Sequence, residues 1–258
     1  MTTTEPPPAP QGTSLPGLTV TSLADRPELL PDLEDLYDRG WPAFMSADPV
    51  DIECWPQLLE LAPHLQLAML DDDRVIATAH AVPLDWDPSQ ELAQEGWDWG
   101  FAKGIADVRA GRPTEAACAL AITIESDRRG GGVGITMLNA LRDQVRRHGG
   151  RWLVGPLRPS GKSAEPMVPF REYIARVRDD GLPSDPWLRS HVRVGARVGE
   201  PCERSMTITA SVTQWEEWSG IPHQVGLPYI VPSALIPVAV DEGVGRYVEP
   251  NIWVIHDL

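Results

Sequence analysis

The stretch DRRGGGVGITML (residues 127–138) contains four glycines, three of them consecutive. Residues 115–124, just before it, are nearly all apolar or β-branched, which is typical of a strand buried on both faces. After it, apolar residues recur at helical spacing until Gly149. The glycines are therefore predicted to form a turn between a central strand and a helix.

Such a turn favours binding of an anion. The first N–H groups of a helix have no acceptor within the helix, and the helix dipole places partial positive charge there. Glycine lets a ligand approach these N–H groups closely because it has no side chain. A diphosphate is the ligand that this turn predicts.

Two common nucleotide-binding motifs do not fit the sequence. The dinucleotide fingerprint G-x-G-x-x-G would need a small final residue, but it reaches Ile135 from Gly130 and Met137 from Gly132. The stretch GPLRPSGKS (155–163) is similar to a P-loop, but five residues separate its two glycines where the P-loop has four. We therefore expect neither motif.

The coarse pattern along the chain is one of helices alternating with strands. Helices are predicted over residues 26–40, over 54–64 and after Gly100, and a short one is predicted with Thr213 as its cap. The predicted strands lie at residues 18–23, 65–70, 74–82, 115–124, 151–157 and 203–212, with two more near the C-terminus.

Residues 129–134 resemble the [Q/R]-x-x-G-x-[G/A] signature of the GNAT superfamily of acyl-CoA N-acyltransferases. The order of elements around this signature is also similar to that family, over about residues 18–215. The resemblance implies an α/β fold with a GNAT-like mixed central sheet flanked by helices. It also implies a V-shaped splay between the fourth and fifth strands.

The same resemblance predicts the domain organisation. Residues 18–258 are expected to form a single acyltransferase domain, with insertions at about 84–113 and 158–185 and a C-terminal β extension at about 213–258. The Pro-rich residues 1–17 are expected to be a disordered lead, since they contain too few apolar residues to offset chain entropy.

In function, the resemblance implies transfer of an acetyl or other acyl group from acetyl-CoA or another acyl-CoA to a small-molecule amine. The amine would attack the thioester directly in a ternary complex, and no metal is expected. The diphosphate would bind the signature and the pantetheine arm would lie along the fourth strand. The implied cofactor-binding residues are Ile122, Ile124, Arg129, Gly130, Gly131, Gly132, Val133, Gly134 and Ile135.

Many members of the family use a Tyr on a later helix as the catalytic acid, four residues before a glycine. Residues 186–198 resemble that helix and its exit, and His191 stands at the Tyr position, four residues before Gly195. We therefore expect His191 to be the catalytic acid, the alternative being a helix histidine packed beside Trp187. Three candidates for a general base remain open, namely His80, Glu115 and Glu125.

The acceptor pocket is less well defined by the sequence. One interpretation is an apolar pocket covered by both insertions, with Trp99 or Phe101 as a wall; the alternative is that these aromatic residues only pack the core. The stretch 155–163 offers Arg158, Lys162 and the hydroxyls of Ser160 and Ser163, which could contact a carboxylate or phosphate of the acceptor or belong to a simple turn.

The composition of the chain limits the kinds of partner that we expect for it. A net charge of −15 argues against bulk binding to nucleic acid or to an anionic membrane, and it favours a cationic amine as acceptor. The sequence has no apolar run long enough for a membrane span and no secretory signal pattern, so a cytoplasmic protein without a membrane partner is expected. Its three cysteines lack C-x-x-C spacing and are expected to be buried thiols.

Two other functions stay open. The first keeps the fold but takes the acyl or aminoacyl group from a carrier protein or an aminoacyl-tRNA. The second is a non-catalytic module that binds acyl-CoA. For the oligomeric state we expect a monomer or a homodimer.

Overall fold

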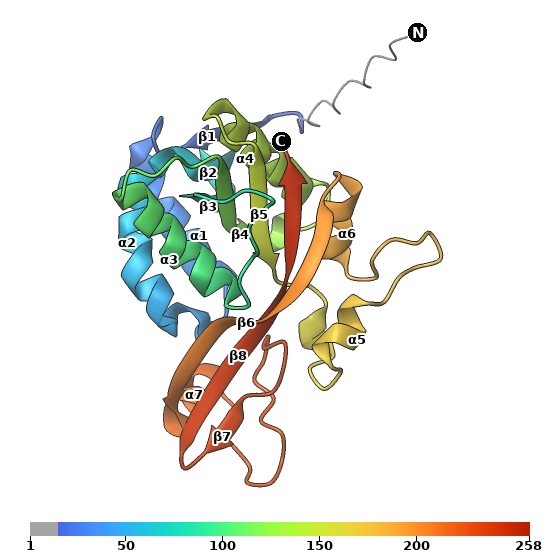
Figure 1. Cartoon of the computed structure of the whole chain (residues 1–258). Coiled ribbons are helices and arrows are strands. Elements are labelled where there is room, and N and C mark those ends of the chain that lie inside the picture. Colours follow the sequence, from blue (N-terminus) through green and yellow to red (C-terminus); the bar gives the residue numbers. More distant parts are fainter. Residues whose placement is uncertain (1–14) are drawn as a thin grey trace.

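The computed structural model describes residues 15–258, so residues 1–14 of the predicted lead lie outside the described part. One mixed sheet runs through the molecule in the order β1-β2-β3-β4-β5-β8-β6, and β7 pairs with β8 (Figure 1). Among the strands of residues 15–258, only β4 and β5 pair in parallel; the other pairs are antiparallel. The strands are β1 Leu18–Ser22, β2 Gln66–Asp71, β3 Arg74–Leu84, β4 Ala116–Ile124, β5 Trp152–Leu157, β6 Arg197–Ser211, β7 Ala239–Asp241 and β8 Val244–Asp257.

Helices cover both faces of this sheet, as predicted. Alternate residues of β2 show the two sides: Leu70 packs with Leu36 of α1, and Met69 packs with Met137 of α4. The helices α2 and α3 lie on the α1 side, and α6 lies on the α4 side. The α-helices are α1 Leu30–Gly40, α2 Pro49–Leu61, α3 Gly96–Arg109, α4 Val133–Arg147, α5 Phe170–Ile174, α6 Pro186–Arg193 and α7 Val212–Ser219.

Three helices begin at other positions than predicted, and for α2 and α7 the side-chain cap explains the start. α2 begins at Pro49, since the Asp48 carboxylate accepts hydrogen bonds from two amides of the first turn, at 2.8 and 3.3 Å. The cap of α7 is Ser211, whose hydroxyl accepts from the Gln214 amide at 3.2 Å, and not Thr213. α3 begins at Gly96, before the predicted position.

Two glycines bring α3 directly onto the sheet. A Cβ on Gly104 would lie 2.5 Å from Cγ1 of Val82 and 2.8 Å from the carbonyl oxygen of Pro83. A Cβ on Gly100, one turn earlier, would lie 2.6 Å from Sγ of Cys118. Through α3, residues 84–113 therefore form part of the core. The close approach of α3 to the sheet depends on the absence of side chains at Gly100 and Gly104.

Gly104→Ala should destabilise the fold. In an unhindered helix this change would stabilise by about 1 kcal/mol, but here the methyl group overlaps the backbone oxygen of Pro83. We expect the free energy of unfolding in urea to fall by about 1–3 kcal/mol. Ala106→Ser, on the exposed side of the same helix, is the control and should change it by about 0.5 kcal/mol or less. A stabilised Gly104→Ala variant would contradict the packing described here.

The predicted C-terminal β extension provides α7, β7 and β8, and β8 lies inside the sheet. β8 pairs with β5 from Trp152↔Asp257 to Leu157↔Ile252, and it pairs with β6 on its other side. Beyond the part of β8 that pairs with β5, β6 and β8 continue together as a long arm, where β7 pairs with β8 and α7 lies alongside (Figure 1). The three cysteines are buried and free, as predicted. No described helix has the length and apolar character needed to cross a membrane.

Candidate active site

The strands β4 and β5 part from each other, as predicted. Their pairing extends only from Ala116↔Trp152 to Cys118↔Val154, although β4 continues to Ile124 and β5 to Leu157. At the point of separation, a Cβ on Gly155 would lie 3.3 Å from Cβ of Ala119. Beyond it, the facing edges of the two strands have unpaired backbone groups along the V-shaped gap.

A cleft of about 780 Å³ occupies this gap. On one side of the sheet it is lined by Ile135 and Leu138 of α4 and by Trp187 of α6. On the other side it is lined by residues near α1 and on α3, Trp41 and Trp97 among them. The cleft therefore passes between the parted strands and is bounded by helices from both faces of the sheet.

The glycine turn lies at one end of the cleft. Gly130, Gly131 and Gly132 have φ angles of +90°, +56° and +85°, and no atom lies within 4 Å of a Cβ placed on any of them. Gly132 is the N-cap of α4. Among residues 15–258, no backbone hydrogen bond takes up the amides of these three glycines. The open space and the free amides are suited to an anionic ligand.

Gly134 has a different role from its neighbours. A Cβ there would lie 3.2 Å from both Ile124 and Trp187, so the missing side chain allows α4 to pack against the end of β4 and against α6. The amide of Gly134, in the first turn of α4, still has no acceptor within the helix.

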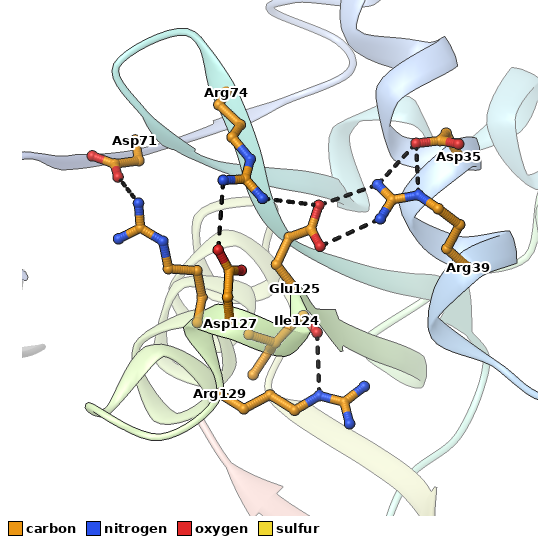
Figure 2. Close-up of polar contacts among 9 residues, drawn as sticks. Asp35, Arg39, Asp71, Arg74, Ile124, Glu125, Asp127 and Arg129 are labelled. Atoms are coloured by element: carbon orange, nitrogen blue, oxygen red, sulfur yellow. Dashed lines mark hydrogen bonds and ion pairs between the residues drawn. The ribbon is translucent and has the colours of Figure 1, made fainter.

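Ion pairs surround the exit of β4. Figure 2 shows Glu125 between the guanidinium groups of Arg39, at 3.1 Å, and Arg74, at 3.5 Å. Nε of Arg129 donates to the carbonyl oxygen of Ile124 at 3.4 Å. The Arg39 pair is the main reason that the pKa of the Glu125 carboxyl lies below its ordinary value. This network joins α1 and β3 to the start of the glycine turn.

Most of the predicted site residues come together. The cleft is lined by Ile122, Ile124, Arg129, Gly130, Gly131, Gly132, Gly134, Ile135 and His191. Val133 is buried and borders a smaller neighbouring hollow of about 410 Å³. Trp97 lines the cleft, whereas Trp99 and Phe101, the expected wall, do not.

The three candidates for a general base do not line the cleft. His80 is fully buried and bonded to Gln66, and burial lowers its pKa to about 3. Glu115 forms an exposed ion pair with Arg151. Glu125 is held in the ion-pair network described above.

His191 is one half of a buried histidine pair. Its Nδ1 lies 3.0 Å from Nε2 of His256, and its ring is edge-on to Trp187 at 4.6 Å. Burial, His256 and Arg142 together hold the pKa of His191 well below its ordinary value, so the ring is neutral at neutral pH. Nε2 of His191 is buried and has no hydrogen-bond partner among the described residues. A neutral ring with one free nitrogen can donate or accept a single hydrogen bond.

The carboxyl groups of Asp48 and Asp98 interact with each other and do not line the cleft. Asp48 caps α2 and is fully buried, and Asp98 lies in the first turn of α3, next to Trp97. Burial first, and Asp48 second, raise the pKa of Asp98 to about 8. The pair therefore holds a proton at neutral pH.

Asp98→Asn should flatten the pH dependence of stability. The folded pKa of Asp98 is raised above its unfolded value of about 4. The protonated Asp98 carboxyl therefore contributes its full stabilisation of the fold below the unfolded pKa of about 4, and this contribution is lost as the pH rises towards 8. Between pH 5 and 8 the wild type should lose at least about 1 kcal/mol of unfolding free energy more than Asp98→Asn. Urea titrations at both pH values measure this, and parallel curves would contradict it.

Two residues of β8 that line the cleft, Glu249 and Asn251, were missed in the sequence. Both are buried. They alternate with apolar residues in the segment YVEPNIWV (247–254), so polar groups recur on one face of an otherwise apolar strand. From the sequence, this alternation could have predicted a polar site within the sheet.

No protein-family model matches the chain. Its sequence is 34% identical over 282 residues to the arginine N-acetyltransferase avaD of Aspergillus versicolor. The alignment covers 96% of this chain and 97% of that protein.

Solved structures share the fold. The loading GNATL domain of CurA from Lyngbya majuscula matches with a TM-score of 0.57 and 16% identity, over 93% of this chain and 97% of that one. The GphF GNAT-like decarboxylase, in complex with isobutyryl-CoA, matches with a TM-score of 0.54 and 17% identity, over 93% and 98%. The solved structures, the parted strands and the glycine turn agree in fold, and the N-acetyltransferase relative shows that the chain belongs to the GNAT superfamily and is an N-acyltransferase.

Proposed function

We propose that this protein transfers an acyl group, acetyl first among the candidates, from acyl-CoA to a small cationic amine by direct attack in a ternary complex. The observation that carries the proposal is the cleft, which leads from the glycine turn between β4 and β5 to the opposite face of the sheet. Donor and acceptor can enter from opposite faces and meet between the strands. Residues 18–258 act in this proposal as one catalytic domain.

The donor binds on the α4 side. The free amides of the glycine turn and of the first turn of α4 receive the diphosphate, and the Arg129 guanidinium adds positive charge. The pantetheine arm lies along the unpaired edge of β4, where the backbone near Ile122 and Ile124 provides hydrogen-bonding groups. Val133 contributes through its place in the turn rather than through its side chain, which is buried.

The acceptor binds on the α3 side, near Trp41 and Trp97. The relative avaD is named for acetylation of arginine, a cationic amine. A net charge of −15 attracts cations over long range, and aromatic faces bind guanidinium and ammonium groups at short range. Arginine is therefore the first acceptor to test.

The chemistry needs a deprotonated amine, a fixed thioester and stabilisation of the leaving thiolate. The C–N bond forms as the C–S bond breaks, and the proton that the amine nitrogen loses balances the charge of the thiolate. A neutral imidazole holds its proton more tightly than a thiol does, so His191 does not protonate the thiolate outright. It donates a hydrogen bond to the leaving sulfur from Nε2, the nitrogen without a partner. This requires His256 to donate from Nε2 to Nδ1 of His191, which fixes the tautomer.

Thiol release from acetyl-CoA, followed in the presence of arginine and a panel of primary amines, tests the proposal. We expect release that depends on both substrates, with the acetylated amine identified by mass. Calorimetry with CoA tests donor binding separately. Donors on a carrier protein or on tRNA, and a non-catalytic module, both predict no thiol release from free acetyl-CoA, and that result would contradict the proposal.

A further inference from the structure

A buried polar cluster lies where β5 ends and the cleft is open. Glu249 is completely buried, and both of its carboxylate oxygens accept from Nε of Arg158 at 3.0 Å. The Tyr247 hydroxyl donates to the same carboxylate at 2.8 Å, and Nδ2 of Asn251 donates to it at 3.2 Å. Arg158 is only 18% exposed and follows the last residue of β5. One carboxylate thus fixes the positions of an arginine and an asparagine.

Each of these two side chains keeps one hydrogen-bonding group free. Arg158 uses Nε for Glu249 and Nη2 for the carbonyl oxygen of Ser233, and its Nη1 bonds to no residue between 15 and 258. Asn251 uses Nδ2 for Glu249 and for the Pro250 carbonyl, while its Oδ1 accepts from no residue in the same range. Arg158 and Asn251 both line the cleft. The cluster therefore offers one cationic donor and one neutral acceptor.

The cluster lies on the acceptor side of the sheet. Residues of β8 alternate between the faces: Trp253 packs with Trp97 of α3, and Ile252 packs with Leu188 of α6. Asn251 and Glu249 precede Trp253 by two and four residues and so share its face. That face is opposite α4 and α6, from which the donor enters.

We infer that Arg158 and Asn251 bind the carboxylate and the amine of a free α-amino acid, so that this enzyme acetylates an amino acid and not a decarboxylated or carboxyl-blocked amine. The inference rests on the proposed function and specifies its acceptor. A guanidinium N–H is a strong partner for a carboxylate, and the amide oxygen accepts an N–H from the neutral amine, whose lone pair stays free to attack. Glu249 positions both groups.

The wild-type protein provides the first test. Acetyl transfer is measured with arginine, with agmatine, which lacks the carboxylate, and with arginine methyl ester, in which it is blocked. Loss of a partner from a buried charged hydrogen bond predicts kcat/KM at least about 30-fold lower for agmatine and for the ester than for arginine. Equal values for arginine and agmatine would overturn the inference but leave the proposed function intact. No thiol release with any amine would overturn both.

The variant Arg158→Lys tests whether Arg158 causes the preference for arginine over agmatine. Lysine keeps the charge next to Glu249 but loses the free Nη1, so kcat/KM for arginine should fall about tenfold or more while agmatine changes less than about threefold. Arg171→Lys is the matched control, because Arg171 is 61% exposed, pairs with Glu203 and does not line the cleft. An equal loss for both substrates in Arg158→Lys would contradict carboxylate binding. If that variant does not fold, the wild-type comparison alone decides.

Discussion

Gly132→Glu should weaken CoA binding by at least about 100-fold, or about 3 kcal/mol at 25 °C. Gly132 is the N-cap of α4, with φ of +85° and nothing within 4 Å of a Cβ placed on it. A glutamate there puts a side chain and a negative charge where we propose that the diphosphate lies. Calorimetry with CoA measures the loss, and acetyl transfer should fall with it.

Gly149→Glu is the matched control. Gly149 follows the other end of α4, with φ of +86° and open space around its Cβ position, so both variants place a non-glycine residue in a left-handed conformation at a similar cost of about 1–2 kcal/mol. The helix dipole favours an acid at residue 132 and disfavours it at residue 149. Gly132→Glu should therefore be at least as stable as the control and yet lose CoA binding. Equal CoA affinity in the two variants would contradict the proposed diphosphate site.

The sequence predicted the framework around the glycine turn well. The apolar run before the glycines and the helical spacing after them defined β4 and α4, because both elements are long and regular. Helix caps were harder to predict. An Asp before a Pro, as at residues 48 and 49, is compatible with the start of a helix, but the hydrogen bonds that begin α2 there cannot be read from the sequence. The separation of β4 from β5 was predicted from the family resemblance and not from the spacing of residues.

The acceptor side of the cleft was largely missed, for a physical reason. Trp97, Arg158, Glu249 and Asn251 come from three distant segments of the chain. The pairing of β5 with β8 brings Arg158 to Glu249 and Asn251, and the packing of α3 on the same face of β8 adds Trp97. Local periodicity carries no information about which strands become neighbours. The sequence did indicate Arg158 as a possible contact to the acceptor, but its pairing with Glu249 of β8 could not be predicted.

His191→Ala should lower kcat by about 100- to 1,000-fold at saturating acetyl-CoA, the usual cost of removing one donor to developing charge. CoA affinity should change less than about threefold, because the diphosphate site lies on the glycine turn. His191→Gln, which keeps an N–H donor, should recover part of the rate. His148→Ala, at the end of α4 and outside the cleft, is the control and should be fully active.

The pH dependence separates hydrogen bonding by His191 from acid catalysis. A catalytic imidazolium would lose its proton, and the enzyme its activity, as pH rose through the histidine pKa. Burial and the neighbouring His256 and Arg142 hold the pKa of His191 well below 6.5, so the ring stays neutral from about pH 6.5 upward. The wild-type kcat should therefore not fall between pH 6.5 and 8. A fall in that range that is absent from His191→Gln would show that the charged form is catalytic, and an unchanged rate in His191→Ala would remove His191 from the mechanism.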